Sequence, residues 1–166
     1  MSNALLPEDF VVPTLLETDQ FRLRMLSIKD VELDYEAVMT SREHLRSIFA
    51  AHTTWPADDM TLERDLEDLR RHQHEFETRT AFAYTVVSLD EHLCLGCVYI
   101  YPVSKSTYDA HVYLWVRSSE LEKGLDSVLF ATVKAWIDHD WFFKHVAYPG
   151  RDIDWQTWKT FDCKQR

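Results

Sequence analysis

Residues 109–140, DAHVYLWVRSSELEKGLDSVLFATVKAWIDHD, are the stretch from which the fold can be predicted. Between residues 110 and 116, small and aliphatic side chains alternate with His111 and two aromatic residues, and a period of two is typical of a β-strand. Both faces of this strand carry bulk, which predicts a central place in a sheet. Apolar residues then recur at helical spacing from Leu125 onward, so we expect a helix that begins near Gly124.

The junction between this strand and this helix is a candidate anion site. A strand that runs into the first turn of a helix directs several free backbone N–H groups toward one point, where a phosphate can bind. Arg117 and Lys123 are the nearby cations, and Glu122 and Asp126 are nearby acids that would also suit a helix N-terminus without a ligand. An ordinary strand-to-helix connection is therefore the alternative interpretation.

The composition predicts one folded domain over residues 1–166. With 46% hydrophobic and 28% charged residues, the chain can bury a core of its own and needs no second domain. A net charge of -10 predicts no nucleic-acid partner and no anionic membrane partner, and it is compatible with a cationic amine. Because no apolar run reaches the roughly 20 residues of a membrane span, and the N-terminus does not resemble a signal peptide, we expect a cytoplasmic protein.

The three cysteines predict no disulfide framework, because their number is odd and the chain shows no secretory signal. Cys94 and Cys97 have the spacing of half a zinc or redox motif. Inside a strand, residues three apart point to opposite faces, so we expect two buried thiols and no metal site. His72, His74 and Glu75 lie on a predicted helix, where positions two apart do not share a face, and we expect a solvated polar surface there.

The rest of the chain predicts helices and strands in a definite order. Periodicity, turn signals and the N-caps Ser27 and Thr61 predict a first strand over residues 14–26 with a bend at residues 18–19, helices over 27–40, 45–49 and 61–77, and strands over 82–88, 93–101 and 144–148. We expect loops at residues 50–59 and 103–108 to form walls of a substrate site.

This order resembles that of the GNAT superfamily of N-acyltransferases over residues 16–148. FRLRMLSIKD, residues 21–30, resembles the opening strand and turn of that family, and LGCVYIYP, residues 95–102, resembles the strand before the central one. VYLWV, residues 112–116, resembles the strand that splays from its parallel neighbour to receive the pantetheine arm. The resemblance implies an α/β (α+β) fold with a mixed, mainly antiparallel central sheet and helices on both faces.

The same resemblance implies a binding site for acetyl-CoA as acyl donor. Residues 121–126, LEKGLD, stand where the family has the turn Q/R-x-x-G-x-G/A, and only Gly124 matches its defining positions. Leu121 stands in place of Gln or Arg, and Asp126 stands in place of a small residue. The cofactor-binding residues implied by position are Leu114, Trp115, Val116, Arg117, Glu122, Lys123, Gly124, Leu125 and Asp126.

The family's chemistry implies direct attack of a primary amine on the thioester, with a small cationic amine as acceptor. His111 stands at the position of the family's glutamate base, with Asp109 and Glu120 as alternative bases on the same strand. A packed strand histidine is the structural alternative. Tyr148 is the candidate acid for the leaving thiolate, because no tyrosine follows it.

Two interpretations remain open at this point: an N-acetyltransferase, or a catalytically silent member of the fold that acts as a binding or regulatory module. The side chain of Asp126 separates them, because a carboxylate that fills the phosphate position would favour the silent module. The chain ends at Arg166, before strands that many members carry, so we expect an acceptor site that is open or completed by a second subunit in a homodimer.

Overall fold

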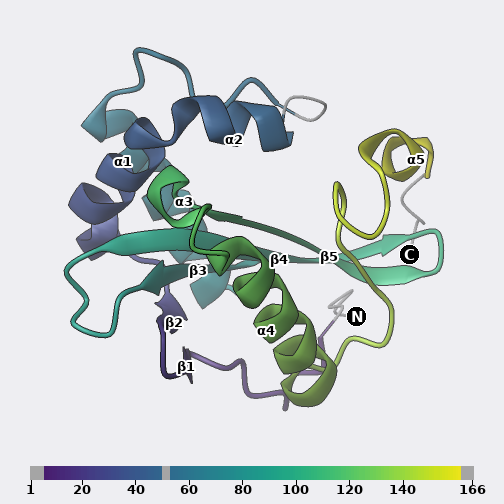
Figure 1. The fold of residues 1–166 in the computed structure, drawn as a ribbon. Helices are drawn as coiled ribbons and strands as arrows, with labels where there is room; N and C mark the ends of the chain where they lie inside the picture. Colours follow the sequence, from purple (N-terminus) through teal and green to yellow (C-terminus); the bar gives the residue numbers. More distant parts are fainter. Residues whose placement is uncertain (1–5, 50–52, 162–166) are drawn as a thin grey trace.

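A computed structural model of the chain describes residues 6–49 and 53–161, and its elements follow the predicted order (Figure 1). Along the chain they are β1 (Leu15–Glu17), β2 (Arg22–Met25), the 3-10 turn η1 (Ile28–Asp30), α1 (Val31–Thr40), α2 (Arg42–Phe49), α3 (Leu62–Glu77), β3 (Phe82–Val87), β4 (Cys94–Lys105), β5 (Tyr108–Val116), the 3-10 turn η2 (Ser118–Glu120), α4 (Leu125–Asp140), β6 (Val146–Ala147) and α5 (Trp155–Thr160).

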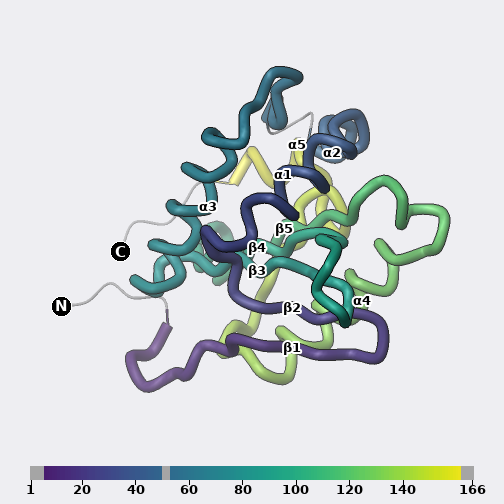
Figure 2. Tube along the Cα trace, turned by 90° about the vertical axis from the view of Figure 1, so that its left-hand side faces the viewer, coloured from purple at the N-terminus to yellow at the C-terminus, as the bar shows by residue number. Residues whose placement is uncertain are grey.

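The strands form one six-stranded sheet in the order β1-β2-β3-β4-β5-β6. Every neighbouring pair is antiparallel except β5 and β6, which run parallel. The predicted mixed, mainly antiparallel sheet is therefore confirmed. In Figure 2 the strands follow one another from β1, at the outer edge, to β5 in the interior of the molecule.

Helices cover both faces of the sheet, as predicted (Figure 1). Helix α4 packs on one face, where its fully buried Leu129 and Ile137 share a core cluster with Leu114 of β5. Helices α1, α2 and α3 lie on the opposite face, where Leu69 of α3 shares a second cluster with the buried Trp115. Alternate residues of β5 thus enter two different cores, which is the two-faced strand that the sequence indicated.

The parallel pairing of β5 with β6 is short. It comprises the pairs Ala110 with Val146 and His111 with Ala147, after which β6 ends and the chain turns near Pro149. Strand β5 continues to Val116, so along the described residues its edge beyond His111 has no strand beside it. This is the opening between parallel strands that the family resemblance implied.

Three details differ from the sequence prediction. The first strand expected over residues 14–26 is two strands, β1 and β2, which pair with each other antiparallel. Strand β4 does not end at Pro102 but continues to Lys105, and residues 103–108 form the end of a β4–β5 hairpin with a register shift after Pro102. The last pair of β3 with β4 is Phe82 with Ile100, so Pro102 lies where β4 has one neighbour only, and edge segments tolerate proline. Helix α5 was not predicted, because six residues are too few to show a helical period.

Among the helices in the described part of the chain, none has the length and apolar character that crossing a membrane would require.

We predict that Gly96→Ala destabilises the protein strongly. A Cβ at residue 96 would overlap the carbonyl oxygen of Trp115 on β5, so the two central strands would have to separate. The expected loss in the free energy of unfolding is about 3 kcal/mol, measured by urea denaturation. The matched control is Gly124→Ala, which has a positive φ of 78° but open space around it and should lose only about 1 kcal/mol. Equal losses in the two variants would contradict this account.

Candidate functional site

The N-terminus of α4 lies beside the open edge of β5. Gly124 adopts the left-handed conformation at the N-cap, with φ 78°, and no side chain caps the helix there. Its first backbone N–H groups have no partner within the helix and can donate to an anion. The structure therefore brings together the predicted residues 124–126 and the β5 edge that carries Leu114 and Val116.

An ion pair occupies the space between this helix and the strand edge. The guanidinium group of Arg151 donates to both carboxylate oxygens of Asp126, each at 2.9 Å, and also to the carbonyl oxygen of Leu114 at 3.2 Å. Arg151 holds the pKa of the Asp126 carboxyl below its usual range. Asp126 thus neither caps the helix nor points freely into the opening, because it is fixed by a cation that the sequence analysis did not single out.

His44 of α2 lies at the same edge. Its ring contacts the backbone carbonyl of Val116, and burial lowers the pKa of the imidazole, while the carboxylate of Asp126 partly offsets that effect. Side chains of the protein itself therefore engage the carbonyls of both Leu114 and Val116. Neither His44 nor Arg151 could be found from sequence, because each comes from an element distant from β5.

The two cations predicted near the phosphate position are engaged elsewhere. Arg117 is buried and donates to both carboxylate oxygens of Glu36, each at 2.7 Å, and to the carbonyl oxygen of Cys94 at 3.1 Å. Its guanidinium therefore ties α1 to the sheet. Lys123 is exposed, and its ammonium group lies 3.3 Å from Glu120. Glu122 is also exposed in the same turn.

The candidate catalytic residues His111 and Tyr148 lie on opposite faces of the sheet. The His111 ring stacks on Tyr101, with centroids 5.0 Å apart, and approaches Trp158 of α5 at 5.2 Å. Tyr148 instead packs edge-on against Phe130 of α4, on the far face, at 5.2 Å. The structure therefore does not bring the two together as one acid–base pair, and their roles stay predictions.

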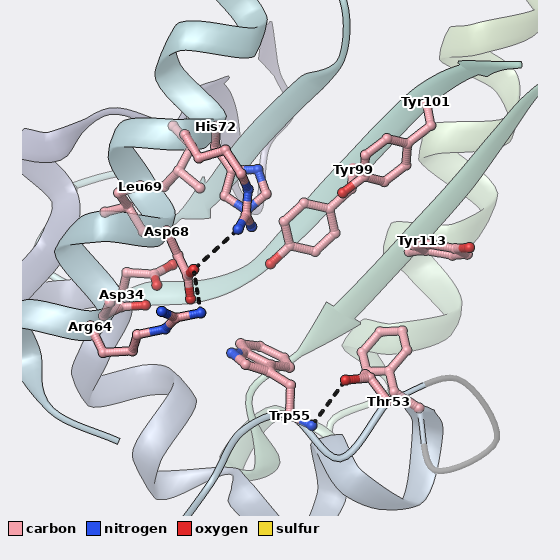
Figure 3. A pocket seen from close by; sticks show the side chains of 14 residues that line it. Asp34, Thr53, Trp55, Arg64, Asp68, Leu69, His72, Tyr99, Tyr101 and Tyr113 are labelled. Carbon is pink, nitrogen blue, oxygen red and sulfur yellow. Dashed lines mark hydrogen bonds and ion pairs between the residues drawn. The ribbon is translucent and has the colours of Figure 1, made fainter. Parts of the chain in front are cut away.

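A pocket of about 350 Å³ opens on the face of the sheet that carries α1, α2 and α3 (Figure 3). Tyrosines of β4 and β5 form one wall, α3 forms another, and the predicted wall loop contributes Thr53 and Trp55, whereas residues 50–52 of that loop lie outside the described part of the chain. The lining residues are Leu26, Asp34, Phe49, Thr53, Trp55, Arg64, Asp65, Asp68, Leu69, Arg71, His72, Tyr99, Tyr101 and Tyr113.

Two buried carboxyl groups form the floor of this pocket. Asp34 is 4% exposed and Asp65 is 2% exposed, and the two are hydrogen-bonded to each other. Burial, together with nearby Cys94 and Asp30, raises the pKa of Asp34 to about 7. Burial and the charge of Asp34 raise the pKa of Asp65 to about 9. Near neutral pH this pair retains protons that exposed carboxyl groups would release.

The charges at the rim of the pocket compensate one another. Asp68 lies 3.3 Å from Arg71 and 3.9 Å from Arg64 (Figure 3). His72 was expected on a solvated surface, but its side chain is only 12% exposed and its ring packs on Tyr99 at 5.3 Å. Burial lowers the pKa of His72 to about 4, so this imidazole is neutral at physiological pH.

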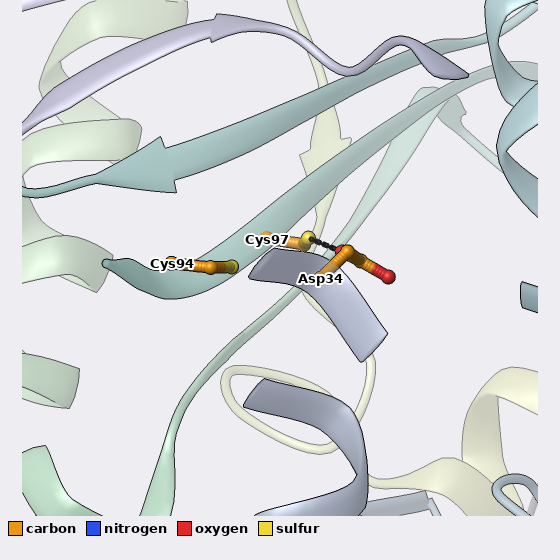
Figure 4. Close-up of side chains that lie close together, drawn as sticks. All are labelled: Asp34, Cys94 and Cys97. Carbon is orange, nitrogen blue, oxygen red and sulfur yellow. Dashed lines mark hydrogen bonds between the residues drawn. The ribbon is translucent and has the colours of Figure 1, made fainter. Parts of the chain in front are cut away.

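The two thiols of β4 point to the same side, which corrects the sequence prediction of opposite faces (Figure 4). The register shifts so that Val86 pairs with Gly96 while Val87 pairs with Cys94, and the extra residue is a β-bulge that reverses the alternation. Cys97 donates to the Oδ1 atom of Asp34 at 3.4 Å. Ligand atoms of Asp34, Cys94 and Cys97 all lie within 4.8 Å of one another. These three donors are one fewer than a structural zinc site uses, and both thiols are buried, as expected.

Comparison with known proteins bears on the fold. No family model matches this chain, and no curated protein sequence matches it. Solved structures do match. One, a protein from Bordetella pertussis assigned to the GnaT family of acetyltransferases, has a TM-score of 0.59 at 13% identity and covers 82% of this chain and 78% of its own. The chain has the GNAT fold.

Two further structures with this fold were solved with ligands. RimL, a ribosomal L7/L12 α-N-protein acetyltransferase in complex with coenzyme A, has a TM-score of 0.59 at 14% identity over 74% of this chain and 67% of its own. Microcin C7 self immunity acetyltransferase MccE, in complex with acetyl-CoA and AMP, has a TM-score of 0.59 at 13% identity over 76% of this chain and 68% of its own. At these identities the similarity establishes the GNAT fold alone.

We predict that the carboxyl pair makes the stability of this GNAT-fold protein fall as pH rises. Both pKa values are raised in the folded state, so the folded protein holds protons that the unfolded chain loses above about pH 4. The free energy of unfolding should therefore decline between about pH 4 and pH 9. Asp65→Asn should remove part of this decline. Between pH 5 and pH 9, the free energy of unfolding of the variant should fall by about 2 kcal/mol less than that of wild type.

Urea denaturation at pH 5, 7 and 9 measures this difference. The groups that face the pair are Asp30, Asp68, Cys94 and Cys97, which both proteins share. Asp19→Asn, in the exposed turn between β1 and β2, is the matched control and should show the same pH dependence as wild type. A constant difference between Asp65→Asn and wild type at all three pH values would show that the pair does not titrate as described.

Proposed function

We propose that this protein is an N-acetyltransferase that transfers an acetyl group from acetyl-CoA to a primary amine of a small cationic acceptor. The observation that carries the proposal is the open edge of β5, which meets the first turn of α4 on one side and a pocket with an acidic floor on the other. Two structures with the same fold are complexes with coenzyme A or acetyl-CoA. An acidic chain with a net charge of -10 also favours a cationic acceptor.

The donor side of this site contains groups suited to the phosphates of acetyl-CoA. The free N–H groups at the start of α4 favour an anion. Arg151 is bound to Asp126 in the first turn of this helix and, once detached from it, would supply the bidentate contact that the altered turn lacks. The backbone of Leu114 and Val116 would pair with the amide groups of the pantetheine arm.

Acetyl transfer to an amine forms a C–N bond and breaks the C–S bond of the thioester. The amine attacks in its neutral form, so one proton must leave its nitrogen and another must reach the sulfur. We assign the first task to His111, which lies on the pocket side of β5 two residues before the pocket residue Tyr113. The second task stays with Tyr148 as a proposal: it lies on the α4 face, opposite His111, and burial raises the pKa of its phenol and keeps the group protonated.

A catalytically silent module is the second candidate function. The observation in its favour is the Asp126–Arg151 ion pair, which together with His44 occupies the backbone carbonyls of the β5 edge. If this pair does not open, acetyl-CoA has no path to the strand. The two candidates therefore differ in whether acetyl-CoA displaces Arg151.

We predict that acetyl-CoA stabilises the protein and that Asp126→Asn strengthens this binding. The amide removes the charge that holds Arg151 and the charge that repels the phosphates. A ligand at a hundred times its dissociation constant adds about 2.7 kcal/mol, which raises the midpoint of thermal unfolding by several degrees. The measurement is this midpoint with and without millimolar acetyl-CoA, with Asp19→Asn as the control for loss of one acidic charge. A shift in neither wild type nor Asp126→Asn would exclude the acetyltransferase.

His111→Gln should lower kcat by about a hundredfold while the binding of acetyl-CoA is unchanged, because glutamine keeps a polar side chain but cannot take a proton. Steady-state kinetics with an amine acceptor measures kcat, and the thermal midpoint measures donor binding. His74→Gln on the outside of α3 is the matched control and should behave as wild type. Full activity in His111→Gln would assign the base to another residue.

A further inference from the structure

We propose that the Asp34–Asp65 carboxyl pair binds the ammonium group of a linear diamine, whose second amino group lies at the β5 end of the same pocket. The proposal rests on the proposed function for its second amino group, which would be the acetylated one. The ammonium site itself follows from the pocket alone.

The first observation is a buried carboxyl oxygen of the Asp34–Asp65 pair that accepts no hydrogen bond from the described residues. Among the residues that the structure describes, the Oδ2 atom of Asp65 is buried and accepts no hydrogen bond. Asp65 is 2% exposed and lines the pocket. A buried acceptor without a donor costs free energy, which a ligand N–H group would recover.

The second observation is the balance of charge around the pocket. Asp68 is shared between Arg64 and Arg71, and the guanidinium of each arginine also lies near a second acid on α3, Glu67 or Glu75. Lining residue His72 is uncharged. Among the described lining residues, no cation pairs with the carboxyl groups of Asp34 and Asp65. A cationic ligand would therefore complement their charge.

The third observation is the aromatic wall. Phe49, Trp55, Tyr99, Tyr101 and Tyr113 line the pocket. Aromatic faces attract an ammonium group and pack well against a methylene chain. A volume of about 350 Å³ is at the lower end of the range for small-molecule sites. The pocket is therefore suited to a short alkyl chain with a cationic end.

The pocket extends from α1 and α3 to β5, which favours a ligand with two functional groups. Its acidic floor lies against α1 and α3, whereas Tyr113 lines it on β5, directly before Leu114 on the open edge. A ligand whose ammonium group contacts Asp65 thus extends along the tyrosines toward the edge where acetyl transfer would occur. A second amino group on a short chain is the chemistry that uses both ends.

Binding of 1,4-diaminobutane, measured by isothermal titration calorimetry with and without saturating coenzyme A, tests the proposal. We expect wild type to bind this diamine at least about tenfold more tightly than 1-aminobutane, and to bind neither 1,4-butanediol nor 4-aminobutyrate appreciably. Asp65→Asn, which keeps the shape of the side chain, should weaken diamine binding about tenfold or more. Asp19→Asn removes the same charge from an exposed turn and should change the affinity less than twofold.

Several outcomes would overturn the ammonium site. These are equal binding of the diol and the diamine, no diamine binding with or without coenzyme A, or unchanged affinity in Asp65→Asn. If Asp65→Asn does not fold, the series of ligands on wild type still decides. Diamine binding without any response to acetyl-CoA would retain the ammonium site and reject the acetyltransferase, whereas the reverse result would retain the enzyme and reject this acceptor.

Discussion

The short parallel contact between β5 and β6 is the constraint on which the rest of the site depends. Because it ends after His111, the carbonyls of Leu114 and Val116 face a space that no strand of residues 6–49 or 53–161 fills. Backbone groups in such a place need hydrogen-bond partners. The loop after β6 supplies Arg151, and α2 supplies His44. The short β5–β6 pairing therefore explains why the loop with Arg151 and helix α2 with His44 lie at this edge.

Strand β5 also divides the candidate site into two electrostatically different halves. On the α4 side, a helix N-terminus and Arg151 offer positive potential that is offset by Asp126. On the other side, the pocket ends on two buried acids, Asp34 and Asp65, among aromatic rings. Strand β5, which is 9 residues long and buried from Leu114 to Val116, separates the proposed anion site from the proposed cation site.

Much of the fold could be predicted from sequence, whereas the site could be predicted only in part. The period of β5, the caps at Ser27 and Thr61 and the apolar stripe after Gly124 are local signals, and all were confirmed. The partner of Asp126 is Arg151, 25 positions away, and no local pattern links them. The Asp34–Asp65 pair joins helices α1 and α3. In the sequence of each helix, the aspartate is one of many polar residues, and nothing marks it as buried.

The bulge in β4 shows how one residue changes the meaning of a sequence pattern. Before Leu95, even-numbered residues point to the face that odd-numbered residues occupy after Leu95. The two thiols meet Asp34 only because the parity changes between them. The side chains of β4 therefore change their alternation between the two faces of the sheet at Leu95. Without Leu95 the alternation would be regular and both thiols would stay on the Asp34 face, whereas the same sequence paired without a bulge would turn Cys94 toward α4.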